Sequence, residues 1–205
     1  HREGIGVILD WSPAQFPRYA GGLEKFDGTP LYEGKDPEMA VHPMWGTMLY
    51  NYDSPMVMDF LISNACFWLE VFHVDGLRMD DVDAMLYLDY GRKDGWTPNM
   101  YGSNENLQAI EFLKHLNSIL KKRDPGALLI AQDGLWPELT DSVENDHIGF
   151  DYKWSGGWTR DFLFYLSVDP ILRKNYHDQL TLSTLYAYSE HYILTLGSRD
   201  VGNLE

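Results

Sequence analysis

The chain has little of what several classes of protein require. Its 205 residues include a single cysteine, Cys66, which excludes a disulfide framework. Because this thiol lies in the apolar segment 65–69, we interpret it as a packing residue in preference to a nucleophile. No apolar run reaches the roughly 18 to 20 residues of a membrane span, and the first residues do not resemble a secretory leader. These absences predict a soluble protein of the reducing cytoplasm.

Basic residues are also scarce. There are 16 Lys and Arg against 31 Asp and Glu, which leaves a formal net charge of −15. Because binding to phosphates depends on Lys and Arg that release counterions, we expect no nucleic-acid partner and no membrane partner. Hydrophobic residues make up 44% of the chain and aromatic residues 14%, which is enough to build a large core. The length by itself predicts one globular domain.

Several familiar site motifs are missing as well. The seven histidines show no His-x-x-x-His spacing, so we expect no zinc site. There is no glycine-rich phosphate loop and no Gly-x-Ser-x-Gly segment, so we expect neither a nucleotide cofactor nor serine-hydrolase chemistry. The acids Asp80, Asp81 and Asp83 could in principle hold calcium, but we favour a solvated carboxylate cluster. We therefore predict no metal and no cofactor.

Short apolar runs alternate with helical periods along the chain. The runs predict strands at 4–10, 72–80, 127–131 and 192–196, and the first is expected to be buried on both faces. The helical periods cover 54–70, 104–120 and 180–190, with Ser54 able to cap the first helix. Residues 11–53 have no periodicity and predict a long functional loop. This alternation predicts an α/β fold with a parallel sheet.

Polar side chains follow the predicted strands at their carboxyl ends, where open sheets and barrels bind ligands. They are Asp10, the Arg78/Asp80 pair, Gln132 with Asp133, and Arg199 with Asp200. Because side chains alternate along a strand, Arg78 and Asp80 are expected to point to the same side. A guanidinium beside a carboxylate keeps the acid ionised, as a carboxylate nucleophile requires. A purely structural ion pair at a strand end is the alternative.

The segment Asp75–Asp80, followed by 84–90, resembles the second conserved region of the α-amylase superfamily as it occurs in 1,4-α-glucan (glycogen) branching enzymes. Further stretches are similar to bacterial branching enzymes, namely 4–11, 26–33, 42–43, 45–47, 62–65, 104–106 and 153–154. The resemblance implies a partial (β/α)8 TIM barrel with parallel strands, from about strand 3 to strand 7. Residues 1–205 would then be a single catalytic-barrel segment, incomplete at both ends. Its implied partners are an α-1,4-glucan such as glycogen or amylose, and the missing remainder of the barrel or another chain.

The family transfers glucan segments to 6-hydroxyls with retention, using an Asp nucleophile and a Glu acid. The resemblance assigns Asp80 to the nucleophile, Arg78 to the side chain that orients it, and Asp10 to an Asp that helps hold the substrate site together. Gln132 occupies the position of the general acid, and an amide cannot deliver a proton to the leaving oxygen. Asp133 is the nearest substitute, although neighbouring residues on a strand point to opposite faces.

Other positions also depart from the family pattern. Gln15 stands where the family carries a substrate-binding His. Near residue 198, an ungapped alignment places Ser198 at a His and Arg199 at the Asp that stabilises the transition state. A gapped alignment lets Arg199 replace the His and lets Asp200 keep the role of that Asp. Trp96, in the loop after the second conserved region, is the aromatic residue that we expect to contact glucan.

Three hypotheses for the function follow from these departures. The first is an α-glucan-active protein that resembles a branching enzyme and whose catalysis is impaired by Gln132. The second is a non-catalytic glucan-binding or regulatory module, and the third is a glycoside hydrolase that uses Asp80 and Asp133. The departures gather at the site while the apolar framework is kept, which favours the first hypothesis. Because an open arc of strands exposes its edges, we also expect poor stability or association of the isolated chain.

Overall fold

The computed structural model describes residues 1–132, 136, 139–140, 147–186 and 188–196. The elements are, in chain order, β1 Ile8–Trp11, β2 Gln15–Phe16, β3 Met48–Leu49, α1 Pro55–Glu70, β4 Gly76–Met79, α2 Val82–Leu86, α3 Leu107–Arg123, β5 Leu128–Gln132, β6 Tyr152–Ser155, α4 Gly156–Ser167, the 3-10 turn η2 Arg173–Asn175, α5 Asp178–Tyr186 and β7 Tyr192–Leu194.

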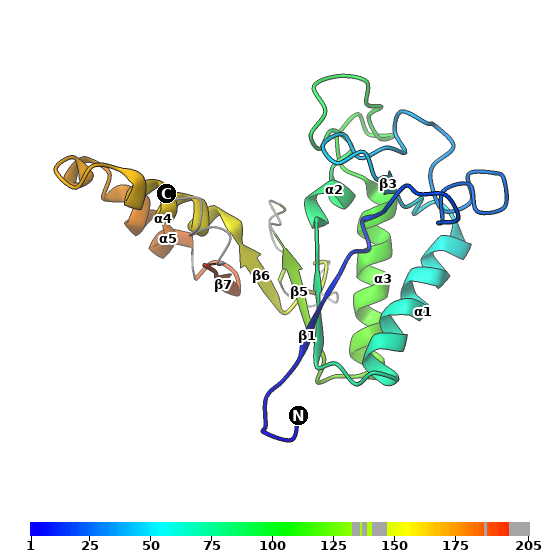
Figure 1. The fold of residues 1–205 in the computed structure, drawn as a ribbon, viewed down its shortest axis with the longest axis horizontal. Coiled ribbons are helices and arrows are strands. Elements are labelled where there is room, and N and C mark those ends of the chain that lie inside the picture. The colour runs from blue at the N-terminus through cyan, green and yellow to red at the C-terminus, as the bar shows by residue number, and fades with distance from the viewer. Residues whose placement is uncertain (133–135, 137–138, 141–146, 187, 197–205) are drawn as a thin grey trace.

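Five of these strands form one parallel sheet, in the order β1-β4-β5-β6-β7. The register pairs Asp10 with Arg78 across β1 and β4, and Gln132 with Trp154 across β5 and β6. Since the strands run in the same direction, their carboxyl ends meet at one edge, near α2 in Figure 1. The short strands β2 and β3 form a separate antiparallel pair within the long segment that follows β1. The predicted α/β fold with a parallel sheet is confirmed.

The main core lies between β4, β5 and two long helices. Helices α1 and α3 lie side by side against one face of the sheet (Figure 1). The strands contribute the buried residues Leu77, Met79, Leu129 and Ala131 to this core. The helices contribute buried residues at the spacing of an amphipathic face, namely Val57, Leu61 and Ala65 of α1 and Phe112, Leu113 and Leu116 of α3. The first residue of β4 is Gly76, and a larger residue would not fit there because its Cβ would collide with the carbonyl oxygen of Leu128. Full burial of one such Leu, Phe or Met stabilises the fold by roughly 1.5 to 3 kcal/mol.

The helix ends match the sequence only in part. Pro55 occupies the first turn of α1 after Ser54, as expected, but the side chain of Ser54 makes no capping hydrogen bond. At α3 the capping residue is Asn106, whose side chain accepts a hydrogen bond from the N–H of Ala109 at 3.3 Å. The last turn of α3 carries Lys121, Lys122 and Arg123, which interact favourably with the helix dipole.

The prediction for the first strand was wrong, and one strand with the helix after it was missed. The first strand begins at Ile8 and is not buried on both faces, since Ile8 is 38% exposed and Val7 before it 47%. Within the described residues β1 pairs with β4 alone, which leaves its other edge uncovered. Strand β6 and helix α4 were not predicted, because Lys153 interrupts the apolar pattern of β6 and two glycines, Gly156 and Gly157, open α4.

The elements after β5 are less well covered than those before it. Helices α4 and α5 extend with β7 away from the α1 and α3 layer (Figure 1). Thr159 is the one buried residue of α4 among those described, whereas large apolar side chains such as Ile171 and Leu185 are 79% exposed. Among the described helices, none is both long and apolar enough to cross a membrane.

Candidate functional site at the carboxyl edge of the sheet

Arg78, on β4, connects polar side chains from the neighbouring strands. Its Nε donates a hydrogen bond to Oδ1 of Asp10 at 2.6 Å, and its Nη2 lies 3.1 Å from Oδ1 of Asp80. Its Nη1 donates to Oε1 of Gln132, at the end of β5. Arg78 and Asp80 therefore lie on the same side, as the alternation predicted. We call Asp10, Arg78, Asp80 and Gln132 the arginine cluster.

The cation of this cluster is covered while its acids face solvent. The side chain of Arg78 is 15% exposed, against 65% for Asp10 and 40% for Asp80. The guanidinium carbon Cζ of Arg78 lies over the ring of Trp154, 4.9 Å from the ring centroid. This distance is within the range of a cation–π contact. The hydrogen bond from Arg78 holds the pKa of Asp10 below its ordinary value. Two solvent-facing carboxylates, those of Asp10 and Asp80, are thus held by one covered guanidinium.

The backbone changes direction immediately after Asp80. Asp81 has φ 59° and ψ 37°, in the left-handed region that a non-glycine residue adopts only at a cost. The turn directs the side chain of Asp81 toward the long segment between β1 and α1. There its Oδ2 lies 3.0 Å from Nε2 of His42 and 3.0 Å from the amide nitrogen of Gln15.

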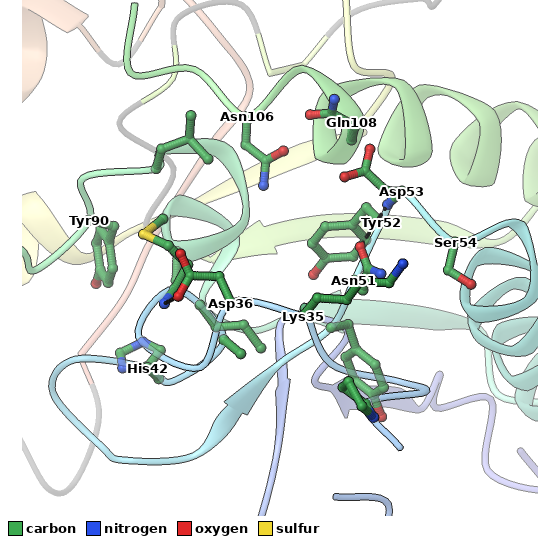
Figure 2. A pocket seen from close by; sticks show the side chains of 18 of the residues that line it. Lys35, Asp36, His42, Asn51, Tyr52, Asp53, Ser54, Tyr90, Asn106 and Gln108 are labelled. Atoms are coloured by element: carbon green, nitrogen blue, oxygen red, sulfur yellow. Dashed lines mark hydrogen bonds between the residues drawn. The ribbon is translucent and has the colours of Figure 1, made fainter. Parts of the chain in front are cut away.

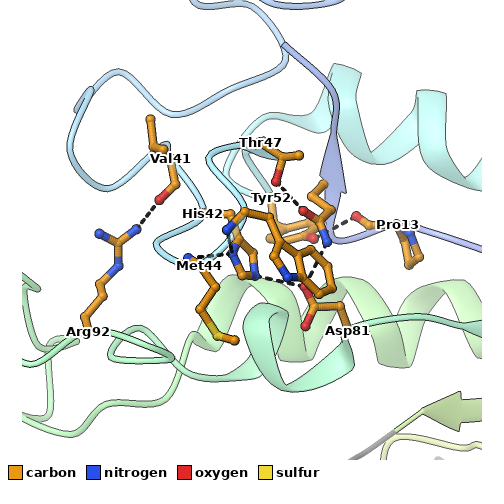
Figure 3. A network of polar contacts seen from close by, with 10 residues as sticks. Pro13, Val41, His42, Met44, Thr47, Tyr52, Asp81 and Arg92 are labelled. Atoms are coloured by element: carbon orange, nitrogen blue, oxygen red, sulfur yellow. Dashed lines mark hydrogen bonds and ion pairs between the residues drawn. The ribbon is translucent and has the colours of Figure 1, made fainter. Parts of the chain in front are cut away.

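His42 and Asp81 form a buried pair, with side-chain exposures of 0% and 6% (Figure 3). The Nδ1 of His42 accepts hydrogen bonds from the backbone N–H groups of Met44 at 3.2 Å and Trp45 at 3.4 Å. With Nδ1 as an acceptor, the ring carries a hydrogen on Nε2, which donates a hydrogen bond to Oδ2 of Asp81. Burial raises the pKa of Asp81, and His42 opposes that shift.

The predicted solvated cluster of three carboxylates was wrong. Asp81 is 9% exposed and Asp83, in α2, is 4% exposed, because α2 and the segment around His42 cover them. Among the described residues, no group of three or more His, Cys, Asp or Glu side chains is arranged to hold a metal ion. Cys66 is buried in the core, and burial raises the pKa of its thiol, which agrees with a packing role.

Gln15 lies in the buried network and not in the arginine cluster. Its amide nitrogen donates to Asp81, and its Oε1 accepts a hydrogen bond from the hydroxyl of Thr47. Nearby, the hydroxyl of Tyr52 donates to the carbonyl oxygen of Pro13 at 2.8 Å (Figure 3). Both ends of the Gln15 amide are thus held by the protein, and its contact with substrate stays a prediction.

The other predicted site residues are not joined to this geometry. Trp96 is half-buried in the segment between α2 and α3 and makes no ring contact with another described residue. Asp133, Ser198, Arg199 and Asp200 lie outside the described residues, so their roles stay predictions. Trp154 and His42 were not predicted as site residues, and Asp81 was predicted only as part of the solvated carboxylate cluster. The signal that existed for Trp154 and His42 was their place in the stretches 153–154 and 42–43, which are similar to branching enzymes. The register of Trp154 with Gln132 comes from the structure.

Comparison with known proteins identifies close relatives. No family model matches the chain. The chain is 51% identical over 203 residues to the 1,4-alpha-glucan branching enzyme GlgB of Methylococcus capsulatus, and 50% identical to those of Thermobifida fusca and Rubrobacter xylanophilus. Each alignment covers 98% of this chain. The chain spans only 27%, 27% and 28% of the length of these relatives.

Solved structures of similar fold are α-amylases. A putative alpha amylase from Salmonella typhimurium matches 88% of this chain with a TM-score of 0.59 and 18% identity, over 28% of its own length. An alpha-amylase from Lactobacillus plantarum matches all of this chain with a TM-score of 0.61 and 16% identity, over 46% of its own length. The five parallel strands are thus an arc of the α-amylase (β/α)8 barrel, which confirms the predicted partial barrel.

Proposed function

Because the chain belongs, as a segment, to the family of 1,4-alpha-glucan branching enzymes, we propose that its arginine cluster binds α-1,4-glucan and is impaired in catalysis. The observation that supports this proposal best is the position of Arg78, which contacts Asp10, Asp80 and Gln132 at once. Three positions that the family resemblance marks as functional are therefore joined by one side chain. A simple ion pair at a strand end would join Arg78 to only one of them.

In the proposed chemistry, Asp80 is the nucleophile. Its carboxylate oxygen forms a bond to the anomeric carbon while the bond from that carbon to the glycosidic oxygen breaks. Arg78, 3.1 Å from Oδ1 of Asp80, holds the carboxylate in place, and Asp10 in turn accepts a hydrogen bond from Nε of the guanidinium. A second glucan would then take the sugar from Asp80 on its 6-hydroxyl.

The step that fails in this proposal is the departure of the glycosidic oxygen. That oxygen needs a proton, and the residue at the acid position is Gln132. The Oε1 of Gln132 accepts a hydrogen bond from Arg78, so this side chain is held within the arginine cluster. An amide can donate a hydrogen bond to a sugar hydroxyl but cannot act as a general acid, whose contribution is about 10² to 10⁴-fold.

The engagement of Gln132 by Arg78 also supports a second candidate, a non-catalytic glucan-binding module. In this case the same cluster would hold a glucan chain and the nucleophile would be idle. The third candidate, a hydrolase, depends on Asp133 and gains no support from the described residues.

Completion of the barrel is part of the proposal. Within the described residues β1 and β7 each pair on one side, and the relatives are more than three times as long as this chain. We expect further strands, from more sequence or from another chain, to close the arc and to cover apolar side chains such as Ile171.

Glycogen co-sedimentation tests the binding part of the proposal. The chain should sediment with glycogen, and Arg78→Ala should weaken the interaction by about tenfold or more, since it leaves two adjacent carboxylates without their cation. Arg123→Ala is the matched control, because Arg123 also forms an ion pair, with Glu70 at 2.6 Å, but at the C-terminal end of α3. Equal sedimentation of the Arg78→Ala and Arg123→Ala variants would contradict a glucan site at the arginine cluster.

A further inference from the structure

We propose that the cavity between residues 30–54, α2 and the start of α3 is a second saccharide site, which takes a neutral α-glucan unit of about the size of maltose. The identity of the sugar rests on the proposed function, whereas the class of ligand follows from the cavity itself. The cavity has a volume of about 680 Å³, within the range of small-molecule sites. Figure 2 shows it from close by, with its polar side chains labelled.

Part of the cavity wall is aromatic. Tyr50, Tyr52, Tyr87 and Tyr90 line it, together with apolar side chains such as Leu31. Burial raises the pKa of Tyr50 to about 12 and that of Tyr52 well above its ordinary value, so both phenols are neutral at physiological pH. Aromatic faces pack well against the C–H faces of sugar rings.

Polar side chains in the cavity have capacity left for a ligand. No hydrogen bond or ion pair joins the side chains of Lys35, Asp53, Ser54 or Gln108 to any residue that the structure describes. In Figure 2, Asp53 and Gln108 project into the same space as Asn106. They include donors and acceptors in close succession. A sugar hydroxyl, which both donates and accepts, matches this mixture.

The charge of the cavity favours a neutral ligand. Lys35 and Arg92 are balanced by Asp36 and Asp53. The guanidinium of Arg92 is moreover occupied, since it donates to backbone carbonyl oxygens, among them that of Val41 at 2.6 Å. A phosphate or carboxylate ligand would meet one uncommitted cation and two carboxylates, which is unfavourable. A polyhydroxylated, uncharged molecule fits better than an anion or a cation.

The cavity lies beside the arginine cluster but is separate from it. His42 lines the cavity and contacts Asp81, which directly follows Asp80 in the chain. The buried His42–Asp81 pair therefore links the cavity wall to the residue that follows Asp80. The residues that line the cavity include none of the arginine cluster.

Methyl NMR of methionine can detect ligand in this cavity directly, because Met39 lines it. The full chain would be labelled with ¹³C-methyl methionine, the Met39 signal assigned with Met39→Leu, and maltose titrated as the probe. We expect a saturable shift of the Met39 signal. Asp53→Ala combined with Gln108→Ala should weaken maltose binding at this signal about tenfold or more, whereas Asp59→Ala, an exposed carboxylate of α1, should leave it unchanged.

Arg78→Ala separates this proposal from the proposed function. If the sites are distinct, the Met39 signal responds to maltose equally in the Arg78→Ala variant, whatever glycogen co-sedimentation shows. A Met39 signal that does not move with maltose would overturn the second site. Loss of the response in Arg78→Ala would also overturn it, since the two regions would then be one continuous site.

Discussion

Asp80 and Asp81 are consecutive carboxylates in opposite environments. The side chain of Asp80 is 40% exposed and faces Arg78, whereas the side chain of Asp81 is 6% exposed and faces His42 and Gln15. The cause is local, since the left-handed backbone at Asp81 ends the alternation of β4 and turns its side chain to the other side of the chain. The carboxylate of Asp80 is thus available to a ligand, whereas that of Asp81 stabilises the fold. Burial and partners, and not residue type, decide the role of each acid.

The largest expected difference between the two acids is in turnover. In a Gln132→Glu background, Asp80→Asn should lower amylose branching by about 10⁴-fold or more, the scale of loss when a covalent enzyme loses its nucleophile. Asp81→Asn should lower it by less than about tenfold, because Asp81 does not face the arginine cluster. Branching would be measured by debranching and chain-length analysis of the product. Similar losses in both variants would remove the distinction, and release of reducing sugar instead of branches would favour the hydrolase hypothesis.

The next difference is in stability, where loss of the His42–Asp81 pair should cost more than loss of Asp80. His42→Ala should lower the free energy of unfolding by about 3 kcal/mol, because it leaves the buried carboxylate of Asp81 without its main partner. Asp80→Ala should lower it by less than about 1 kcal/mol, since Asp80 is partly exposed and Arg78 keeps its contacts with Asp10 and Gln132. Urea unfolding of the two variants measures both values. A larger loss of unfolding free energy in Asp80→Ala than in His42→Ala would contradict the stabilising role of the His42–Asp81 pair.

The smallest expected difference is in the pH dependence of stability, and it compares Asp81 with Asp10, the other acid of the arginine cluster. Arg78 lowers the pKa of Asp10 below its ordinary 3.8, so the stabilisation from Asp10 is present above pH 3.8 and is lost as the pH falls through the lowered pKa. Burial raises the pKa of Asp81 above 3.8, so its protonated form favours folding below pH 3.8, and this contribution declines as the pH rises through the raised pKa.

Asp10 and Asp81 should therefore contribute slopes of opposite sign to the dependence of stability on pH. As the pH rises through the acid range, the stability of the unmodified chain should increase relative to Asp10→Asn and decrease relative to Asp81→Asn. Urea unfolding at a series of pH values near 3.8 measures both slopes. Parallel slopes would show that the two carboxylates share one kind of environment.

The sequence predicted the arginine cluster because simple rules cover it. Alternation along β4 places Arg78 and Asp80 on one side, and parallel strands bring Asp10 and Gln132 to the same edge. It could not predict the buried network. His42 lies 39 residues before Asp81 in a segment without periodicity, and the turn at Asp81 depends on one backbone angle that its residue type does not dictate. Strand β6 was missed for a related reason, since Lys153 is buried there with partners that are distant in sequence, Glu190 at 3.0 Å and the carbonyl oxygen of Trp136 at 2.8 Å.

The central claim is that Asp80 and Arg78 form a glucan site that lacks its general acid at position 132. Amylose branching by the chain with and without Gln132→Glu tests this claim most directly, in the presence of whatever sequence completes the barrel. We predict that Gln132→Glu raises the branching rate by about 10² to 10⁴-fold. An unmodified chain that branches amylose as fast as its Gln132→Glu variant would contradict the claim.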